Sequence, residues 1–149
     1  MRRTAHVKLV NDYFTANEIA RVNASAVETR NLVIHAIWSA KEASLKAWHK
    51  GLRVDTRAVE IALAPFERAP AEWMLFQIRC GGADFVPPLQ GWWRVQGDFV
   101  LTLAANLHTL PDTTELLPEA CLVTHAPVRH AHTPHRIGHT PHHAAHHEN

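Results

Sequence analysis

One carboxylate and two ammonium groups stand close together in the segment Trp38-Ser39-Ala40-Lys41-Glu42-Ala43-Ser44-Leu45-Lys46. On a helix, Trp38, Glu42 and Lys46 are four residues apart and share one face, and Lys41 lies about a hundred degrees round from Glu42. Mg²⁺ prefers oxygen ligands such as a carboxylate, and flanking ammonium groups offset phosphate charge that the ion leaves uncompensated. The pattern therefore suits a magnesium-bound pyrophosphate.

The same spacing also describes an ordinary surface ion pair. Glu42 stands four residues before Lys46, which is the favourable orientation for a stabilising pair on a solvated helix. Spacing alone leaves both interpretations open.

A long helix over residues 25–49 is predicted to carry this segment. Its apolar residues recur at spacings of three and four, no proline interrupts it, and Gly51 is well placed to end it. The apolar set is Val27, Leu32, Ile34, Ile37, Trp38, Leu45 and Trp48. A shorter helix should begin before it at Thr15-Ala16-Asn17-Glu18, which fits a capping box.

After Gly51 the apolar period changes to two, which predicts strands. The candidate strands are residues 58–63, 73–78, 92–95 and 99–103, and the last two flank a short hairpin connection, Gln96-Gly97-Asp98. The order of elements predicts an α+β fold, with helices packed on one face of a small antiparallel sheet.

Composition divides the chain into a globular domain, residues 1–107, and a His/Pro-rich tail, residues 108–149, which is predicted to be poorly ordered. The tail holds five prolines, and histidine stands at positions 125, 130, 132, 135, 139, 142, 143, 146 and 147. Pairs such as His142-His143 and His146-His147 suit Zn²⁺, Ni²⁺ or Cu²⁺. Without acidic or cysteine partners at fixed spacing, we expect such binding to be adventitious.

Charge and cysteine usage exclude several classes of protein. The formal net charge is +1, from 15 basic and 14 acidic side chains, which argues against a nucleic-acid or membrane-surface binder. Cys80 and Cys121 are far apart and suggest neither a disulfide framework nor a thiolate zinc site. A cytoplasmic protein is expected.

The segment Trp38–Lys46, followed by Gly51-Leu52, resembles the signature of the 4′-phosphopantetheinyl transferase superfamily. That signature is an aromatic residue, Ser or Cys, any residue, Lys-Glu-Ala/Ser, two residues and Lys, with Gly-Leu shortly after. Residues 13–19, Tyr-Phe-Thr-Ala-Asn-Glu-Ile, are similar to the segment that opens the second half of the larger, surfactin-synthetase-activating members. The resemblance covers about residues 10–107 and implies a single half of the family's two-fold pseudo-symmetric fold.

The resemblance implies transfer of the 4′-phosphopantetheine group from coenzyme A to a serine of an acyl- or peptidyl-carrier protein, which is holo-acyl-carrier-protein synthase activity. Glu42 matches the family's magnesium ligand, which is also proposed to help deprotonate the attacking serine. Lys41 and Lys46 match lysines that contact the coenzyme A phosphates, and Lys46 is expected to take part in catalysis together with Glu42. Trp38 matches a signature aromatic, although a core anchor for the helix is the preferred interpretation.

Two departures qualify the resemblance. The family usually has glycine two residues before Gly51, where this chain has His49. Its first metal motif, Gly-x-Asp on a strand, has no match in residues 1–10. A truncated or split version is therefore expected, completed by an N-terminal half-domain or a second copy. The alternative is a catalytically silent domain or interaction module with a metal-binding tail.

Overall fold

The computed structural model describes residues 2–106 and 123–124. Its helices are α1 (Arg2–Tyr13), α2 (Ala16–Asn23) and α3 (Val27–Ala47). Two short 3-10 turns follow, η1 (Gly51–Arg53) and η2 (Thr56–Ala58). The strands are β1 (Val59–Leu63), β2 (Met74–Cys80), β3 (Leu89–Gln96), β4 (Phe99–Asn106) and β5 (Val123–Thr124). The predicted α+β class is confirmed.

The strands form one antiparallel sheet in the order β1-β2-β3-β4-β5. The four predicted strands are present with shifted ends, because β2 runs on to Cys80 and β3 begins at Leu89. The start of β3 was missed because glycine, which is unfavourable inside a strand, stands at position 91. The packing explains the glycine, since a Cβ atom there would lie 2.1 Å from the ring of Phe76. The predicted β3–β4 hairpin turns through Gly97, whose φ of 58° is easily adopted by glycine.

Most of the predicted tail, residues 108–149, lies outside the described residues, including Cys121 and the histidines from position 125 onward. Val123 and Thr124 are the exception. They pair with Thr102 and Leu101 of β4 as the edge strand of the sheet.

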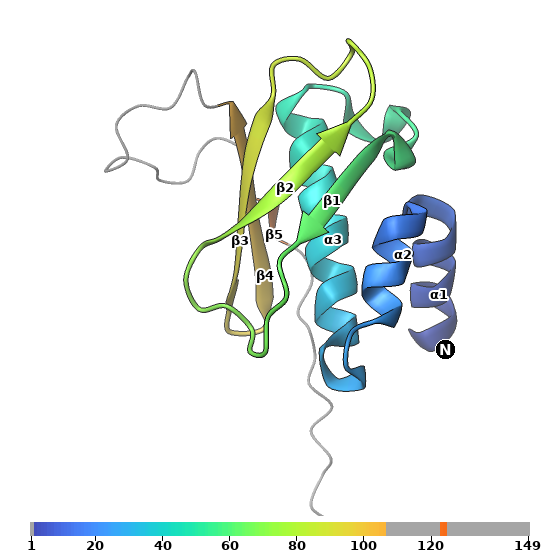
Figure 1. The fold of residues 1–149 in the computed structure, drawn as a ribbon, viewed down its shortest axis with the longest axis vertical. Helices are drawn as coiled ribbons and strands as arrows, with labels where there is room; N and C mark the ends of the chain where they lie inside the picture. Colours follow the sequence, from blue (N-terminus) through green and yellow to red (C-terminus); the bar gives the residue numbers. More distant parts are fainter. Residues whose placement is uncertain (1, 107–122, 125–149) are drawn as a thin grey trace, which may run out of the picture.

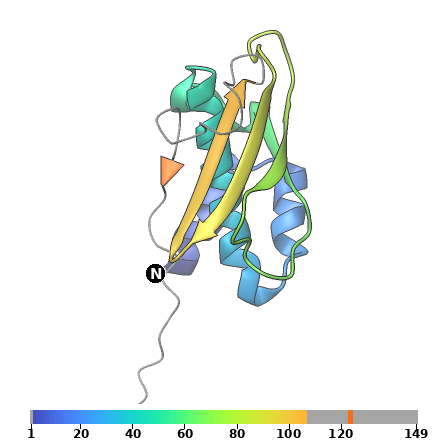
Figure 2. The same cartoon turned by 90° about the vertical axis from the view of Figure 1, so that its left-hand side faces the viewer.

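α3 lies along one face of the sheet, and α1 and α2 lie on the same side (Figure 1). Figure 2 shows the sheet in front with the helices behind it. Along β4 the residues Val100, Thr102 and Ala104 are buried toward α3, where the Ser39 and Thr102 hydroxyls share a 2.7 Å hydrogen bond. The main core of fully buried apolar residues includes Val33, Ala36, Ile37, Ala40, Leu45, Val59 and Trp93.

α1 has no counterpart among the predicted elements. Among its residues 5–13, it buries only Val10 and leaves Val7 58% exposed, so this part lacks the apolar periodicity that marks a packed helix. Its end is anchored by Phe14, which is buried, and by the carbonyl of Tyr13, which accepts a 2.9 Å hydrogen bond from the Thr56 hydroxyl. None of the described helices has the length and apolar composition that a bilayer crossing requires.

The start of α2 has the capping box that the sequence predicts. The Thr15 hydroxyl accepts from the Glu18 amide at 3.2 Å, and the Thr15 amide donates to the Glu18 carboxylate at 2.9 Å. Both groups satisfy backbone donors that a helix start leaves without an internal partner.

Candidate active site

The signature segment lies in the C-terminal half of α3, whose two sides differ in exposure. α3 is continuous from Val27 to Ala47, within two residues of the predicted range at each end. On the side toward the sheet, Ala40 and Ala43 are fully buried. Lys46 is exposed and Glu42 is half-buried, so the prediction that both reach the solvent side of α3 is confirmed.

Lys41 points the other way, into the interior, and its side chain is fully buried. Its ammonium group forms an ion pair with Glu18 at 2.7 Å and donates to the carbonyl of Thr56 at 2.8 Å. A third hydrogen bond goes to the carbonyl of Val59. All three ammonium protons are therefore used within the protein, and they join α3 to α2, η2 and β1.

Glu18 is as well satisfied as its partner. One carboxylate oxygen accepts from the Thr15 amide and from Lys41, and the other accepts from the Ile61 amide of β1 at 2.9 Å. Burial raises the pKa of Glu18 and lowers the pKa of Lys41, while the attraction between the two charges opposes both changes. The pair is thus a desolvated structural contact in which all three ammonium protons and both carboxylate oxygens have a hydrogen-bond partner.

The expectation that Lys41 contacts coenzyme A phosphates does not agree with this position. A side chain with no exposed surface, whose ammonium is already bound to three acceptors, cannot reach a phosphate at the surface. The structure brings together only two of the three predicted site residues, Glu42 and Lys46, on the accessible side of α3.

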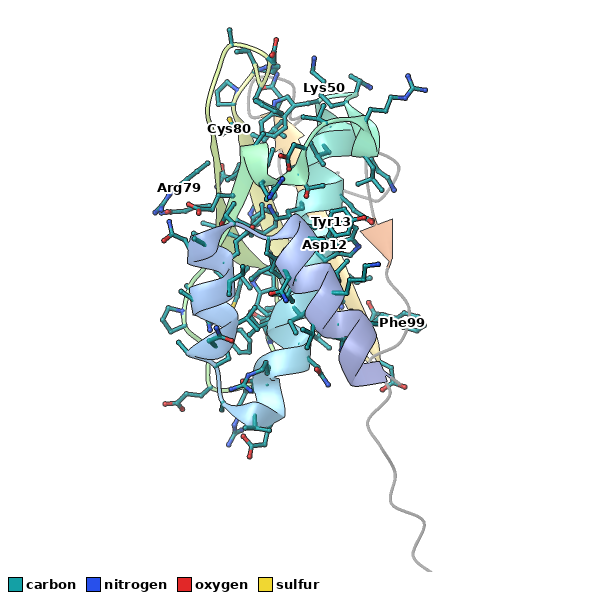
Figure 3. All side chains as sticks on the ribbon, turned by 90° about the vertical axis from the view of Figure 1, so that its right-hand side faces the viewer. Asp12, Tyr13, Lys50, Arg79, Cys80 and Phe99 are labelled. Carbon is teal, nitrogen blue, oxygen red and sulfur yellow. The ribbon has the colours of Figure 1, made fainter. Side chains whose placement is uncertain are left out.

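Trp38 serves mainly as a packing residue, in agreement with the preferred interpretation. It is half-buried against the main core, and its ring lies 5.4 Å from the ring of Tyr13 at the end of α1. This contact places the end of α1 beside the helix face that carries Glu42. Figure 3 shows Tyr13 and Asp12 at that end of α1.

α3 ends in a turn with two left-handed residues, His49 with φ 56° and Gly51 with φ 58°. The predicted stop at Gly51 is therefore only part of the turn, because His49 reverses the chain first. Glycine adopts this conformation without the steric cost that a side chain incurs, so the glycine that the resemblance implies at position 49 would fit this turn. The turn leads directly into η1.

Few groups here can hold a metal ion. Among residues 2–106 and 123–124, no three His, Cys, Asp or Glu side chains lie close enough to enclose one. Mg²⁺ keeps several waters and is commonly held by one or two carboxylates together with substrate phosphates. A half-buried carboxylate such as Glu42 fits one ligand of such an ion.

The family model of the 4′-phosphopantetheinyl transferase superfamily matches residues 1–103 of this chain. The match spans all three helices and the sheet as far as most of β4. The chain therefore belongs to this superfamily, as its signature residues predict, and membership indicates a transferase of phosphopantetheinyl groups. No curated protein and no solved structure matches the chain significantly.

Sequence reasoning missed the second role of Glu18. The capping box identified Glu18 as a local helix-start residue, whereas the structure also uses it as the partner of Lys41 across 23 residues of chain. The sequence does show a carboxylate, Glu18, in one signature segment and a lysine, Lys41, in the other. Nothing in the sequence pattern indicates that these two side chains meet in the fold.

Proposed function

We propose that this chain contributes to the transfer of 4′-phosphopantetheine from coenzyme A to a serine of an acyl- or peptidyl-carrier protein. The observation that carries the proposal is the superfamily match over residues 1–103, together with the signature residues Glu42 and Lys46 on the accessible side of α3. A catalytically silent domain would keep the fold-forming pair Glu18–Lys41 but would have no need of Glu42 and Lys46.

In the proposed reaction the serine oxygen forms a bond to the β-phosphorus of coenzyme A. The bond from that phosphorus to the bridging pyrophosphate oxygen breaks, and 3′,5′-ADP leaves. Glu42 takes the serine proton, and the ammonium of Lys46 offsets charge on the phosphate oxygens. Magnesium, when bound, would neutralise pyrophosphate charge, and Glu42 would supply one of its ligands.

Further ligands would come from the phosphates, from water, and from carboxylates of a matching N-terminal half-domain or a second copy. The ligand count supports this part of the proposal, since one carboxylate is at the low end for Mg²⁺. The assay should therefore be run on the chain alone and on the chain supplied with such a half-domain, in trans or by fusion.

The test is the mass increase of an apo-carrier protein by one phosphopantetheine group, with and without magnesium. Glu42→Gln should slow transfer by on the order of 100-fold or more, because an amide ligates magnesium poorly and cannot accept the proton. Lys46→Ala should raise the KM for coenzyme A by on the order of 10- to 100-fold, through loss of one charge-assisted contact.

Glu28→Gln, at the exposed first turn of α3, is the matched control and should transfer at the parent rate. Equal rates for Glu42→Gln and the parent would remove the catalytic assignment, leaving Glu42 and Lys46 as a surface ion pair. No transfer under any arrangement, with every variant folded, would support the silent-domain alternative.

A further inference from the structure

The turn that ends α3 presents three side chains next to the proposed site. These residues, Lys50, Leu52 and Arg53, are called here the basic turn. Leu52 is 60% exposed, Arg53 is exposed and Lys50 is half-buried. Figure 3 shows Lys50 at the end of the molecule, beyond the position of Tyr13.

The basic turn adjoins Lys46 because the chain folds back against the last turn of α3 at His49. The His49 amide donates to the carbonyl of Lys46 and the Lys50 amide to the carbonyl of Leu45, each at 2.9 Å. These two hydrogen bonds hold the start of the basic turn against the last turn of α3, which carries Lys46. A partner that contacts the basic turn would lie beside the group held by Lys46.

Positive charge at this surface has no ion-pair partner among the residues that the structure describes. Within residues 2–106, neither Lys50 nor Arg53 forms an ion pair, and the same holds for Lys46. The nearest carboxylate along the chain is Asp55, which is bound to Arg57 through two hydrogen bonds of 3.1 Å. Those hydrogen bonds lower the pKa of Asp55, so its charge already has a partner.

Leu52 distinguishes the basic turn from a simply solvated charge cluster. A single exposed leucine is common and needs no explanation by itself. Here it lies between two cations, one half-buried and one exposed, and the turn that holds it costs a left-handed conformation at His49. An apolar residue with a rim of one charge sign is typical of a surface that recognises an amphipathic partner of the opposite sign.

We propose that the basic turn docks the carrier protein, through an acidic face that includes an apolar residue to meet Leu52. This inference rests on the proposed function, and it adds a recognition surface distinct from Glu42 and Lys46. Docking there would bring the acceptor serine to the same end of α3 as Lys46. The phosphates of a nucleic acid could pair with Lys50 and Arg53, but they offer no apolar group to contact Leu52.

The test variant is Lys50→Glu/Arg53→Glu, which changes formal charge by −4. The matched control is Lys8→Glu/Arg68→Glu, with the same charge change at two exposed positions on α1 and in the β1–β2 loop. In the transfer assay, we expect the KM for the carrier to rise about tenfold in the test variant, with the KM for coenzyme A unchanged. The salt dependence of kcat/KM should also become shallower.

Direct binding separates this proposal from the proposed function. A fluorescently labelled apo-carrier should bind the full parent chain, by anisotropy, with an affinity that falls as salt is raised. The test variant should bind at least about tenfold more weakly, the control as well as the parent, and Leu52→Ser should weaken binding without changing its salt dependence.

Carrier binding without transfer, both by the chain alone and with the added half-domain, would refute the proposed reaction and leave the docking surface standing. Transfer by the parent with equal carrier KM in the test and control variants would overturn the docking surface alone. Absence of carrier binding by the parent would also overturn it, as would RNA binding through Lys50 and Arg53 that leaves the carrier bound.

Discussion

The buried pair between Glu18 and Lys41 supports a quantitative prediction. Replacing Lys41 with Met keeps a similar volume but removes the ammonium that serves three acceptors. The Glu18 carboxylate then retains only the amides of Thr15 and Ile61, and the carbonyl of Thr56 retains the Val59 amide. Breaking one side of a buried ion pair typically costs about 3–5 kcal/mol, a large share of the roughly 5–15 kcal/mol stability of a domain.

The loss should depend on pH in a definite direction. Burial already raises the pKa of Glu18, and Lys41→Met removes the opposing attraction, so the folded-state pKa rises further above the unfolded value of about 4.3. A raised folded pKa means that stability is highest below the unfolded value and falls as pH increases toward the folded value. The free energy of unfolding of Lys41→Met should therefore decrease between pH 5 and pH 8, by up to about 1.4 kcal/mol per pH unit.

Urea denaturation measures this directly, followed by tryptophan fluorescence, since Trp93 is fully buried in the folded protein. The double variant Glu18→Gln/Lys41→Met should lose less than the sum of its single variants, by at least about 1.5 kcal/mol. Arg79→Met is the control, because Arg79 is 61% exposed and 3.7 Å from Glu60. It should cost no more than about 1 kcal/mol.

A loss below about 1 kcal/mol at pH 7 for Lys41→Met, or a loss that is equal at pH 5 and pH 8, would refute the reasoning. Lys41 would then be accessible, and its expected role at the coenzyme A phosphates would again be open.

Two further stability predictions follow from backbone geometry. His49→Gly should raise the free energy of unfolding by about 0.5–1 kcal/mol, because glycine adopts the φ of 56° without steric cost; a lower thermal midpoint than the parent would contradict this. Gly91→Ala should lower it by about 1–3 kcal/mol, because the new Cβ would lie 2.1–2.7 Å from atoms of the buried Phe76 ring. The matched substitution Gly81→Ala, where no atom lies within 4 Å of an added Cβ, should cost little, and equal losses at both positions would refute the packing argument.

Local signals in the sequence predicted most elements, because each depends on residues close together in the chain. The capping box at Thr15 and Glu18, the continuous helix α3 and the hairpin at Gly97 all depend on short-range geometry. α1 was missed because its position is determined by contacts at its end, such as that between Tyr13 and Trp38, rather than by its own apolar pattern.

The direction of Lys41 could not be predicted, and the reason is geometric. Helical spacing places Lys41 about a hundred degrees from Glu42, which is compatible with either the edge of an exposed face or the edge of the core. The position of Glu18 in the folded protein decides whether Lys41 faces solvent or the core, since a buried ammonium group needs a carboxylate within hydrogen-bond distance. The sequence contains Glu18, but the contact joins elements whose arrangement is not encoded in any short pattern.

Lys41 and Glu42 are neighbours on α3 but face different surroundings, and this has a mechanical consequence for the site. The Lys41 ammonium is bound to acceptors on α2, η2 and β1, so the rotation of α3 about its own axis is fixed at the residue before Glu42. Side-chain ends lie roughly 5–6 Å from a helix axis, so a rotation of 20° would move the Glu42 carboxylate by about 2 Å. A shift of about 1 Å is already enough to impair a reactive site. The buried pair therefore restrains Glu42 through backbone geometry, because Lys41 immediately precedes Glu42 on α3.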